Sequence, residues 1–140
     1  MSAKTILIVD GDTVSLNFLE RMLQEQQYSV LGAGLGKEGL INTWRDRPDL
    51  IIFDPVLQDI SSEEFLQGIR QDSRSANIPL LALSSDPNPE KESACLQAGC
   101  NHYVVKSAEA VTTLPAVISS LLEIKHEEAA QKVVAVAKEG

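Results

Sequence analysis

The sequence lacks any long hydrophobic run, and this absence sets the first limits on the class of protein. No stretch approaches the roughly 18–20 apolar residues that a helix needs to cross a bilayer. Residues 1–5 carry one lysine and lead directly into a short apolar run, without the charged region, apolar region and cleavage site of a signal peptide. We therefore expect a cytoplasmic protein that does not bind a membrane.

Positive charge is also scarce, because 12 basic residues stand against 20 acidic ones and the formal net charge is −8. Binding to the phosphate backbone of nucleic acids requires a positively charged surface, and the sequence shows no basic cluster that could form one. We expect no nucleic-acid binding by this chain.

Cysteine and histidine occur only twice each. Cys95 and Cys100 are five residues apart, which is not the spacing of a thioredoxin-type pair or a zinc knuckle. We expect both to be small, semi-buried apolar side chains in a reducing compartment. His102 falls within a strand pattern and is expected to face the surface, whereas His126 falls in a charged segment. Two histidines are too few for a histidine metal cluster.

The apolar residues alternate between two periodicities along a chain whose length suits one domain. Short continuous apolar runs are typical of strands buried on both faces, and amphipathic segments between them are typical of helices. The expected strands are 5–9, 28–33, 50–53, 80–83 and 103–105, and the expected helices lie at 13–26, before Pro48, from 61 or 62 through 69, at 90–98 and from about 113. This strict alternation predicts an α/β domain with a parallel sheet and helices on both faces.

Local signals mark where several of these helices begin or end. Thr13 is the expected N-terminal cap of the first helix, Ser61 or Ser62 that of the third, and Gly99 the C-terminal cap of the fourth. Residues 124–140 exceed what five β-α units need, and their apolar residues continue at helical spacing. We expect a domain at 1–123 followed by a helical extension or linker.

Polar residues follow four of the five expected strands. They are Asp10, Asp54, Ser84 and Lys106. In an open parallel sheet, ligands bind outside the carboxyl ends of the strands, so these side chains should meet at one edge. A carboxylate can attack phosphorus, a second carboxylate can help to hold Mg²⁺, and a lysine with a hydroxyl can stabilise phosphoryl oxygens. The pattern favours phosphoryl transfer over a mere ion pair, which would desolvate charge for little gain in stability.

Five segments of the sequence are similar to receiver domains of bacterial response regulators. They are Ile-Leu-Ile-Val-Asp at 6–10, Pro-Asp-Leu-Ile-Ile-Phe-Asp at 48–54, Ile-Pro-Leu-Leu-Ala-Leu-Ser at 78–84, Gln-Ala-Gly-Cys at 97–100 and Tyr-Val-Val-Lys at 103–106. The resemblance extends over about residues 4–122. It implies a flavodoxin-like, doubly wound fold of three layers, in which the five parallel strands have the order 2-1-3-4-5.

The resemblance also implies roles for individual residues. Asp54 stands at the position of the phosphoacceptor, which a histidine kinase or phosphotransfer protein phosphorylates. Lys106 and Ser84 complete the implied catalytic set, while Ser84 and Tyr103 occupy the switch positions. The implied module is a signalling domain that catalyses at most its own phosphotransfer and dephosphorylation. Its implied partners include a C-terminal output domain or a second copy of the chain.

Mg²⁺ is the implied cofactor, and the sequence departs from the family at its site. The implied ligands are Asp10, Asp54 and the backbone carbonyl of Val56. The family usually has two adjacent acids after the first strand, but Gly11 follows Asp10 here, with Asp12 as the residue that could compensate. We expect weak Mg²⁺ binding and slow phosphorylation.

Three more departures keep a second interpretation open. Gln58, Ser62 and Ser107 stand where the family usually has proline, glycine and proline. A degenerate receiver that acts as a phosphorylation-independent docking module would tolerate all of these changes.

Two further motifs suggest other functions. Gly34-Leu-Gly36-Lys-Glu-Gly39 has the spacing of a dinucleotide fingerprint, but it follows the second strand and its helix is short. Asp10-Gly-Asp12 resembles the Asp-x-Asp motif of haloacid-dehalogenase-type phosphatases. That mechanism needs a further acid pair, and none follows a strand after Lys106. The phosphatase remains a third hypothesis.

Overall fold

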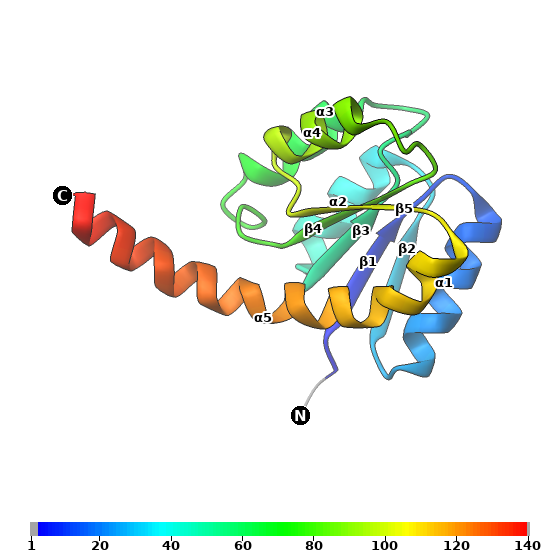
Figure 1. The fold of residues 1–140 in the computed structure, drawn as a ribbon, viewed down its shortest axis with the longest axis horizontal. Helices are drawn as coiled ribbons and strands as arrows, with labels where there is room; N and C mark the ends of the chain where they lie inside the picture. Colours follow the sequence, from blue (N-terminus) through cyan, green and yellow to red (C-terminus); the bar gives the residue numbers. More distant parts are fainter. Residues whose placement is uncertain (1–2, 140) are drawn as a thin grey trace.

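A central sheet lies between two layers of helices in the computed structural model, which describes residues 3–139 and the side chains of residues 3–123 (Figure 1). The elements in chain order are β1 Thr5–Val9, α1 Thr13–Glu25, β2 Ser29–Ala33, α2 Gly36–Asp46, β3 Leu50–Phe53, α3 Ser62–Arg70, β4 Leu80–Ser84, α4 Pro89–Ala98, β5 His102–Val105 and α5 Ala108–Glu139. The strand boundaries agree with the predicted ones to within one residue.

All strands of the sheet are parallel, and their order is β2-β1-β3-β4-β5. The predicted flavodoxin-like topology is therefore confirmed. α2, α3 and α4 cover one face of the sheet, and α1 and α5 cover the other (Figure 1). Because every crossover returns to the same end, all five strands direct their carboxyl ends to one edge.

The core consists of two apolar clusters, one on each face of the sheet. Successive side chains of a strand point to opposite faces, so Leu7 and Val9 of β1 join one cluster while Ile6 and Ile8 join the other. All four are fully buried. Burial of such a side chain contributes about 1.5–3 kcal/mol, which explains why the central strands are apolar at every position.

Side-chain caps fix the beginning of two helices close to the sheet edge. The prediction that Thr13 caps the first helix is wrong, because Asp12 is the N-cap and its carboxylate accepts a hydrogen bond from the Val14 N–H at 3.1 Å. Ser61 caps α3, as predicted, by accepting from the Glu64 N–H at 3.1 Å. A carboxylate is an efficient cap because it satisfies an N–H and opposes the positive end of the helix dipole.

The beginning of α5 differs from the prediction of a start near residue 113. The helix begins at Ala108, where the Ser107 hydroxyl accepts a hydrogen bond from the Ala110 N–H at 3.1 Å. Pro115 lies inside the helix. The side-chain cap at Ser107 therefore decides the boundary.

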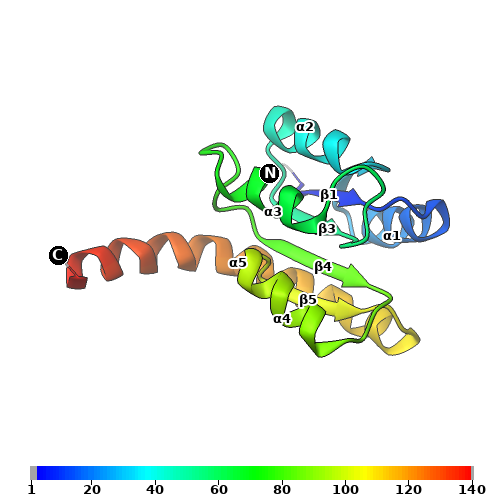
Figure 2. The same ribbon diagram turned by 90° about the horizontal axis from the view of Figure 1, so that it is seen from above.

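The last helix continues beyond the sheet at the end opposite to the carboxyl ends of the strands, as both views show (Figures 1 and 2). It extends to Glu139. The proposed division between residues 123 and 124 remains a prediction, and residue 140, together with the side chains after 123, lies outside the described part. Among the helices of that part, none has the length and hydrophobicity that crossing a membrane requires.

Candidate functional site

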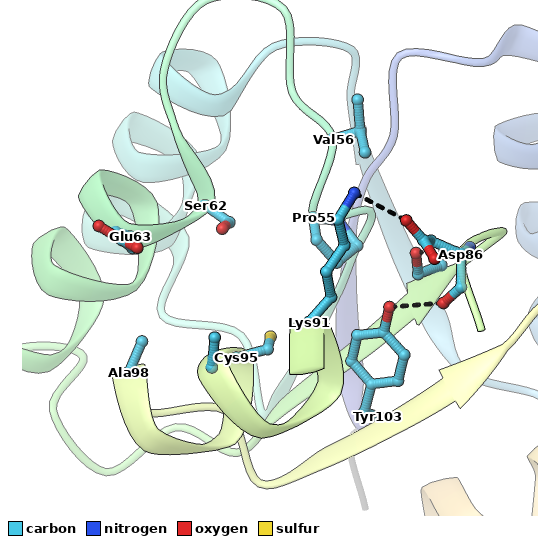
Figure 3. A pocket seen from close by; sticks show the side chains of 11 residues that line it. Pro55, Val56, Ser62, Glu63, Asp86, Lys91, Cys95, Ala98 and Tyr103 are labelled. Carbon is cyan, nitrogen blue, oxygen red and sulfur yellow. Dashed lines mark hydrogen bonds and ion pairs between the residues drawn. The ribbon is translucent and has the colours of Figure 1, made fainter. Parts of the chain in front are cut away.

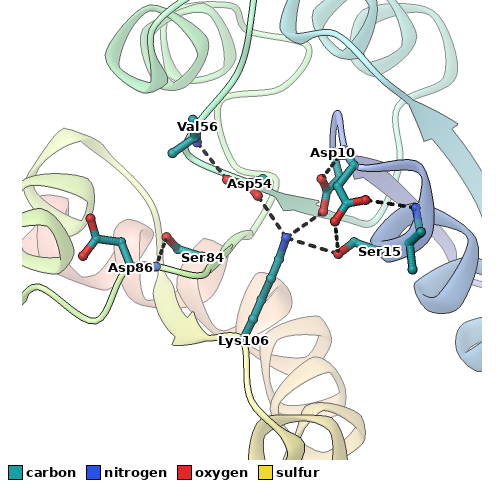
Figure 4. A network of polar contacts seen from close by, with 9 residues as sticks. Asp10, Ser15, Asp54, Val56, Ser84, Asp86 and Lys106 are labelled. Carbon is teal, nitrogen blue, oxygen red and sulfur yellow. Dashed lines mark hydrogen bonds and ion pairs between the residues drawn. The ribbon is translucent and has the colours of Figure 1, made fainter.

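Two acids and a lysine meet at the carboxyl edge of the sheet (Figure 4). The Lys106 ammonium donates to Asp54 Oδ2 at 2.9 Å and to Asp10 Oδ2 at 3.1 Å. The side chains of Asp10, Asp54 and Lys106 are 4%, 13% and 22% exposed, so the ion pairs are largely shielded from water. The sequence-predicted convergence of these three residues is therefore present.

The sheet explains why these residues meet. β1 and β3 are neighbours, and the Asp54 N–H donates to the Val9 carbonyl at 2.9 Å, so the residues that follow the two strands lie side by side. β5 lies two strands away from β3, where the Lys106 N–H donates to the Ser84 carbonyl at 2.7 Å. Only a long side chain can reach the acids from there, and lysine has one.

The electrostatic environment favours the charged form of Lys106. Burial by itself would lower the pKa of this ammonium, but its hydrogen bonds to Asp54 and Asp10 outweigh burial and raise the pKa above 10.5. Two carboxylates against one ammonium leave one uncompensated negative charge. This surplus favours the approach of a cation.

The other oxygen of Asp54 is fixed by the chain that follows it. Oδ1 accepts from the Val56 N–H at 2.8 Å, while the Val56 side chain is exposed to solvent. This loop is held in turn by Asp59, whose carboxylate accepts from the Gly36 N–H at 2.8 Å and from the Lys37 N–H at 2.9 Å. Those N–H groups hold the pKa of the Asp59 carboxyl below its usual value.

No local pattern in the sequence indicates the role of Asp59, because its partners lie 23 and 22 residues away. The same bonds occupy the N-terminus of α2, where the dinucleotide motif would bind a phosphate. A second unpredicted contact is that of Ser15, whose hydroxyl accepts from the Lys106 ammonium at 3.3 Å.

Asp12 lies beside the cluster but is engaged elsewhere. Its carboxylate caps α1 and also accepts from the Ser15 hydroxyl at 3.3 Å, while its own N–H donates to Asp10 Oδ1 at 2.9 Å. Within residues 3–123, no three acidic, histidine or cysteine side chains come together as a metal site. Asp10 and Asp54 are therefore the carboxylates that the edge offers to a cation. A Cβ added at Gly11 would lie 3.4 Å from the Gly34 carbonyl, so this position has room for a larger residue.

Ser84 and Tyr103 lie on the opposite side of Asp54 from Asp10. The buried Ser84 hydroxyl accepts from the Asp86 N–H at 3.0 Å, and the Tyr103 hydroxyl donates to the Asp86 carbonyl at 2.8 Å. Both residues line a cavity of about 250 Å³ between the β3–α3 loop and α4, which Figure 3 shows from close by. The two predicted switch residues are thus joined through one residue, Asp86.

The chain belongs to the response regulator receiver domain family, whose model matches residues 6–118. Membership means that it is a receiver domain of two-component signal transduction, a signalling domain and not a conventional enzyme. The phosphatase and dinucleotide-binding interpretations are set aside by this match.

Solved structures of receiver domains have the same fold. The CheY-like receiver domain protein of Methanospirillum hungatei JF-1 aligns with a TM-score of 0.79 and 26% identity, over 91% of this chain and 99% of that one. The response regulator TrrA of Thermotoga maritima, solved in complex with Mg²⁺ and BeF, aligns with a TM-score of 0.74 and 27% identity, over 84% of this chain and 98% of that one.

Curated relatives include longer proteins. The probable transcriptional regulatory protein TcrX of Mycobacterium tuberculosis is 30% identical over 73% of this chain, which covers 43% of that protein. The putative two-component response regulator ARR21 of Arabidopsis thaliana is 34% identical over 72% of this chain, which covers 16% of it. The chain thus spans less than half of these two relatives. The polar-differentiation response regulator DivK of Brucella anthropi, at 25% identity, is covered over 84% of its length.

Proposed function

We propose that this receiver domain accepts a phosphoryl group on Asp54 from a histidine kinase or phosphotransfer protein and thereby switches an output domain or partner. One observation carries the assignment. The Lys106 ammonium contacts Asp54 at 2.9 Å and Asp10 at 3.1 Å, at the edge where a parallel α/β sheet binds its ligands. We place this activity in the cytoplasm, without a role for membrane or nucleic-acid binding.

The proposed step is a nucleophilic displacement at phosphorus. A carboxylate oxygen of Asp54 forms the new O–P bond while the bond from phosphorus to the donor nitrogen or oxygen breaks, and the leaving atom keeps the electron pair. Lys106 donates to the phosphoryl oxygens and stabilises the charge that they carry in the transition state. The Val56 N–H holds the second Asp54 oxygen in place. The same groups would assist water when it later takes the phosphoryl group from Asp54 and releases inorganic phosphate, so the domain catalyses at most its own phosphotransfer and dephosphorylation.

The donor set fits Mg²⁺. Asp10, Asp54 and the Val56 carbonyl would supply three oxygens, and Mg²⁺ is commonly held by one or two carboxylates with several waters retained. When bound, the cation would neutralise charge on the phosphoryl oxygens. The presence of Mg²⁺ in the Thermotoga maritima TrrA structure supports this cofactor. We propose weak affinity because Gly11 contributes no side chain and Asp12 caps α1.

The proposed switch involves Ser84 and Tyr103. A phosphoryl group on Asp54 would offer new acceptor oxygens to the Ser84 hydroxyl, which now bonds to the Asp86 N–H. A shift of Ser84 toward them would move Asp86, whose carbonyl holds the Tyr103 hydroxyl. The cavity beside these residues leaves room for such a shift.

The intact mass of the protein, measured after incubation with acetyl phosphate and Mg²⁺, tests the proposal. We expect an adduct of about 80 Da, the mass of HPO₃ on one acceptor, in wild type. Asp54→Asn should remove it. The matched control is Asp86→Asn, since Asp86 is a nearby aspartate at the rim of the cavity and should leave the adduct intact. An adduct that persists in Asp54→Asn would overturn the assignment.

A phosphorylation-independent docking module is the second candidate, and the position of Asp12 favours it. With Asp12 used as a helix cap and glycine at position 11, the cluster offers a cation fewer carboxylates than the family usually does. Absence of any adduct in wild type, under conditions that phosphorylate a competent receiver, would support this candidate.

A further inference from the structure

The two cysteines, separated by a short turn, lie in direct contact. Cys95 is in the last turn of α4, and Cys100 follows the C-cap Gly99, whose φ of +127° reverses the chain direction. The Cys100 N–H donates to the Cys95 carbonyl at 3.2 Å, and the two Sγ atoms are 3.1 Å apart. Both thiols are free and buried.

The geometry is close to that of a disulfide. An S–S bond is about 2.05 Å long, so the sulfur atoms need to approach by only about 1 Å. The hydrogen bond between Cys100 and Cys95 already holds the two backbones close together. Formation of a disulfide therefore requires only an adjustment of the two side chains and no refolding of the turn.

Cys95 is also accessible to a small molecule, although it is buried from bulk water. It lines the cavity of about 250 Å³ that is also lined by Ser84, Asp86, Lys91 and Tyr103 (Figure 3). A peroxide is small enough to enter this space. The cavity thus connects Cys95 with the switch side of the candidate site.

The contact makes the two thiols unequal. The hydrogen bond from the Cys100 thiol lowers the pKa of Cys95, against the effect of burial. The same bond, together with burial, raises the pKa of Cys100. The thiolate is the form that reacts with peroxides, so Cys95 has the properties of the attacking thiol and Cys100 those of the resolving one.

We propose that Cys95 and Cys100 are a redox-sensitive modification site, which a low-molecular-weight hydroperoxide converts into an intramolecular disulfide. The Cys95 thiolate attacks the peroxide, so that an S–O bond forms, the O–O bond breaks and an alcohol, or water from hydrogen peroxide, leaves. The Cys100 sulfur then attacks the Cys95 sulfur, so that the S–S bond forms and the S–O bond breaks. Water leaves with the Cys100 proton. Two thiols are oxidised by two electrons and one peroxide is reduced.

The location of the bond gives it a consequence within the domain. A disulfide would join the last turn of α4 to the residue that precedes β5 by two positions, and β5 carries Tyr103. It would therefore tie α4 to the chain that enters β5, and both contribute residues to the lining of the cavity. In a reducing compartment the thiol pair is the resting state, and such disulfides are transient.

Hydrogen peroxide is the probe for the test. The reduced wild-type protein should lose about 2 Da, two hydrogen atoms, and regain them with dithiothreitol. Peptide mapping after alkylation should show a Cys95–Cys100 link. A small exposed thiol in the same tube provides the reference for reactivity. If this reference is fully oxidised while the protein is unchanged, the proposal is overturned. Oxidation to sulfinic acids or to intermolecular disulfides alone would overturn it as well.

Two serine variants test the order of attack. Cys100→Ser should stop at a sulfenic acid on Cys95, which dimedone traps. Cys95→Ser should resist peroxide, because burial raises the pKa of the Cys100 thiol and Cys100 is not among the residues that line the cavity. Equal trapping in both variants would overturn the assigned roles. Circular dichroism checks that both variants fold, and the wild-type experiment tests the disulfide independently of them.

Discussion

The two sides of Asp54 are held by different kinds of interaction. On one side, Lys106 binds Asp54 and Asp10 through charged contacts of 2.9 and 3.1 Å. On the other side, Ser84 and Tyr103 hold Asp86 through neutral hydrogen bonds beside a cavity of about 250 Å³. Hydrogen bonds between charged groups are roughly twice as strong as neutral ones.

This difference suits the two sides to different roles, the phosphoryl transfer on the side of Lys106 and a conformational change on the side of Ser84 and Tyr103. The charged side fixes the groups that would react, whereas the neutral side has weaker bonds and space into which its residues can move. Changes on the charged side should therefore act mainly on phosphorylation and metal binding. Changes on the neutral side should act mainly on stability and switching.

The largest effect is expected from Lys106→Met, which removes the ammonium but keeps much of the length of the side chain. The rate of adduct formation with acetyl phosphate should fall on the order of 100-fold, because an aligned donor to the transition state is lost. Lys91→Met is the matched control, since Lys91 pairs with the half-buried Asp86 at 2.7 Å and both residues line the cavity. Equal slowing by both variants would remove the distinction between the two sides.

Gly11→Asp should strengthen the charged side. An added carboxylate next to Asp10 should tighten Mg²⁺ binding about tenfold, measured by calorimetry, and speed adduct formation. Gly11→Asn is the control, because it adds similar bulk without charge. If Gly11→Asp binds Mg²⁺ no more tightly than wild type, then Asp12 already supplies the missing ligand and our interpretation of the departure is wrong.

The pH dependence of stability should report the Lys106 ion pairs. The pKa of Lys106 is raised above its ordinary value of 10.5, so its contribution to folding is complete below pH 10.5 and is lost as pH rises through the higher folded value. The thermal midpoint of wild type should therefore fall more steeply above pH 10.5 than that of Lys106→Met. Parallel curves would show that these pairs contribute no net stability.

The smallest effect is expected on the neutral side, from Tyr103→Phe. This change keeps the ring and removes one hydrogen bond to the Asp86 carbonyl, so unfolding in urea should show a loss of about 1 kcal/mol. Adduct formation on Asp54 should change little. A loss of phosphorylation comparable with that of Lys106→Met would show that Tyr103 takes part in the phosphoryl transfer, and it would contradict the distinction between the charged and the neutral side.

The sequence by itself determined the sheet and the residues at its edge. The strands are short apolar runs, and in a parallel sheet the residue after each strand reaches the same edge. Asp10, Asp54 and Lys106 could therefore be brought together from their positions alone, and the contacts of Lys106 show that they meet. Ser84 could be placed at that edge for the same reason. Their roles in phosphorylation remain proposals.

Only the tertiary structure decided the contacts that depend on how loops and helices approach one another. Asp59 reaches the N-terminus of α2 across 23 residues, and Ser15 reaches Lys106 across 91. Cys95 and Cys100 meet because the chain turns at Gly99 and both sulfurs point into the same core. Periodicity encodes which face of an element is buried. It does not encode the path of a loop or the angle between elements, and these set which polar groups come within hydrogen-bonding distance.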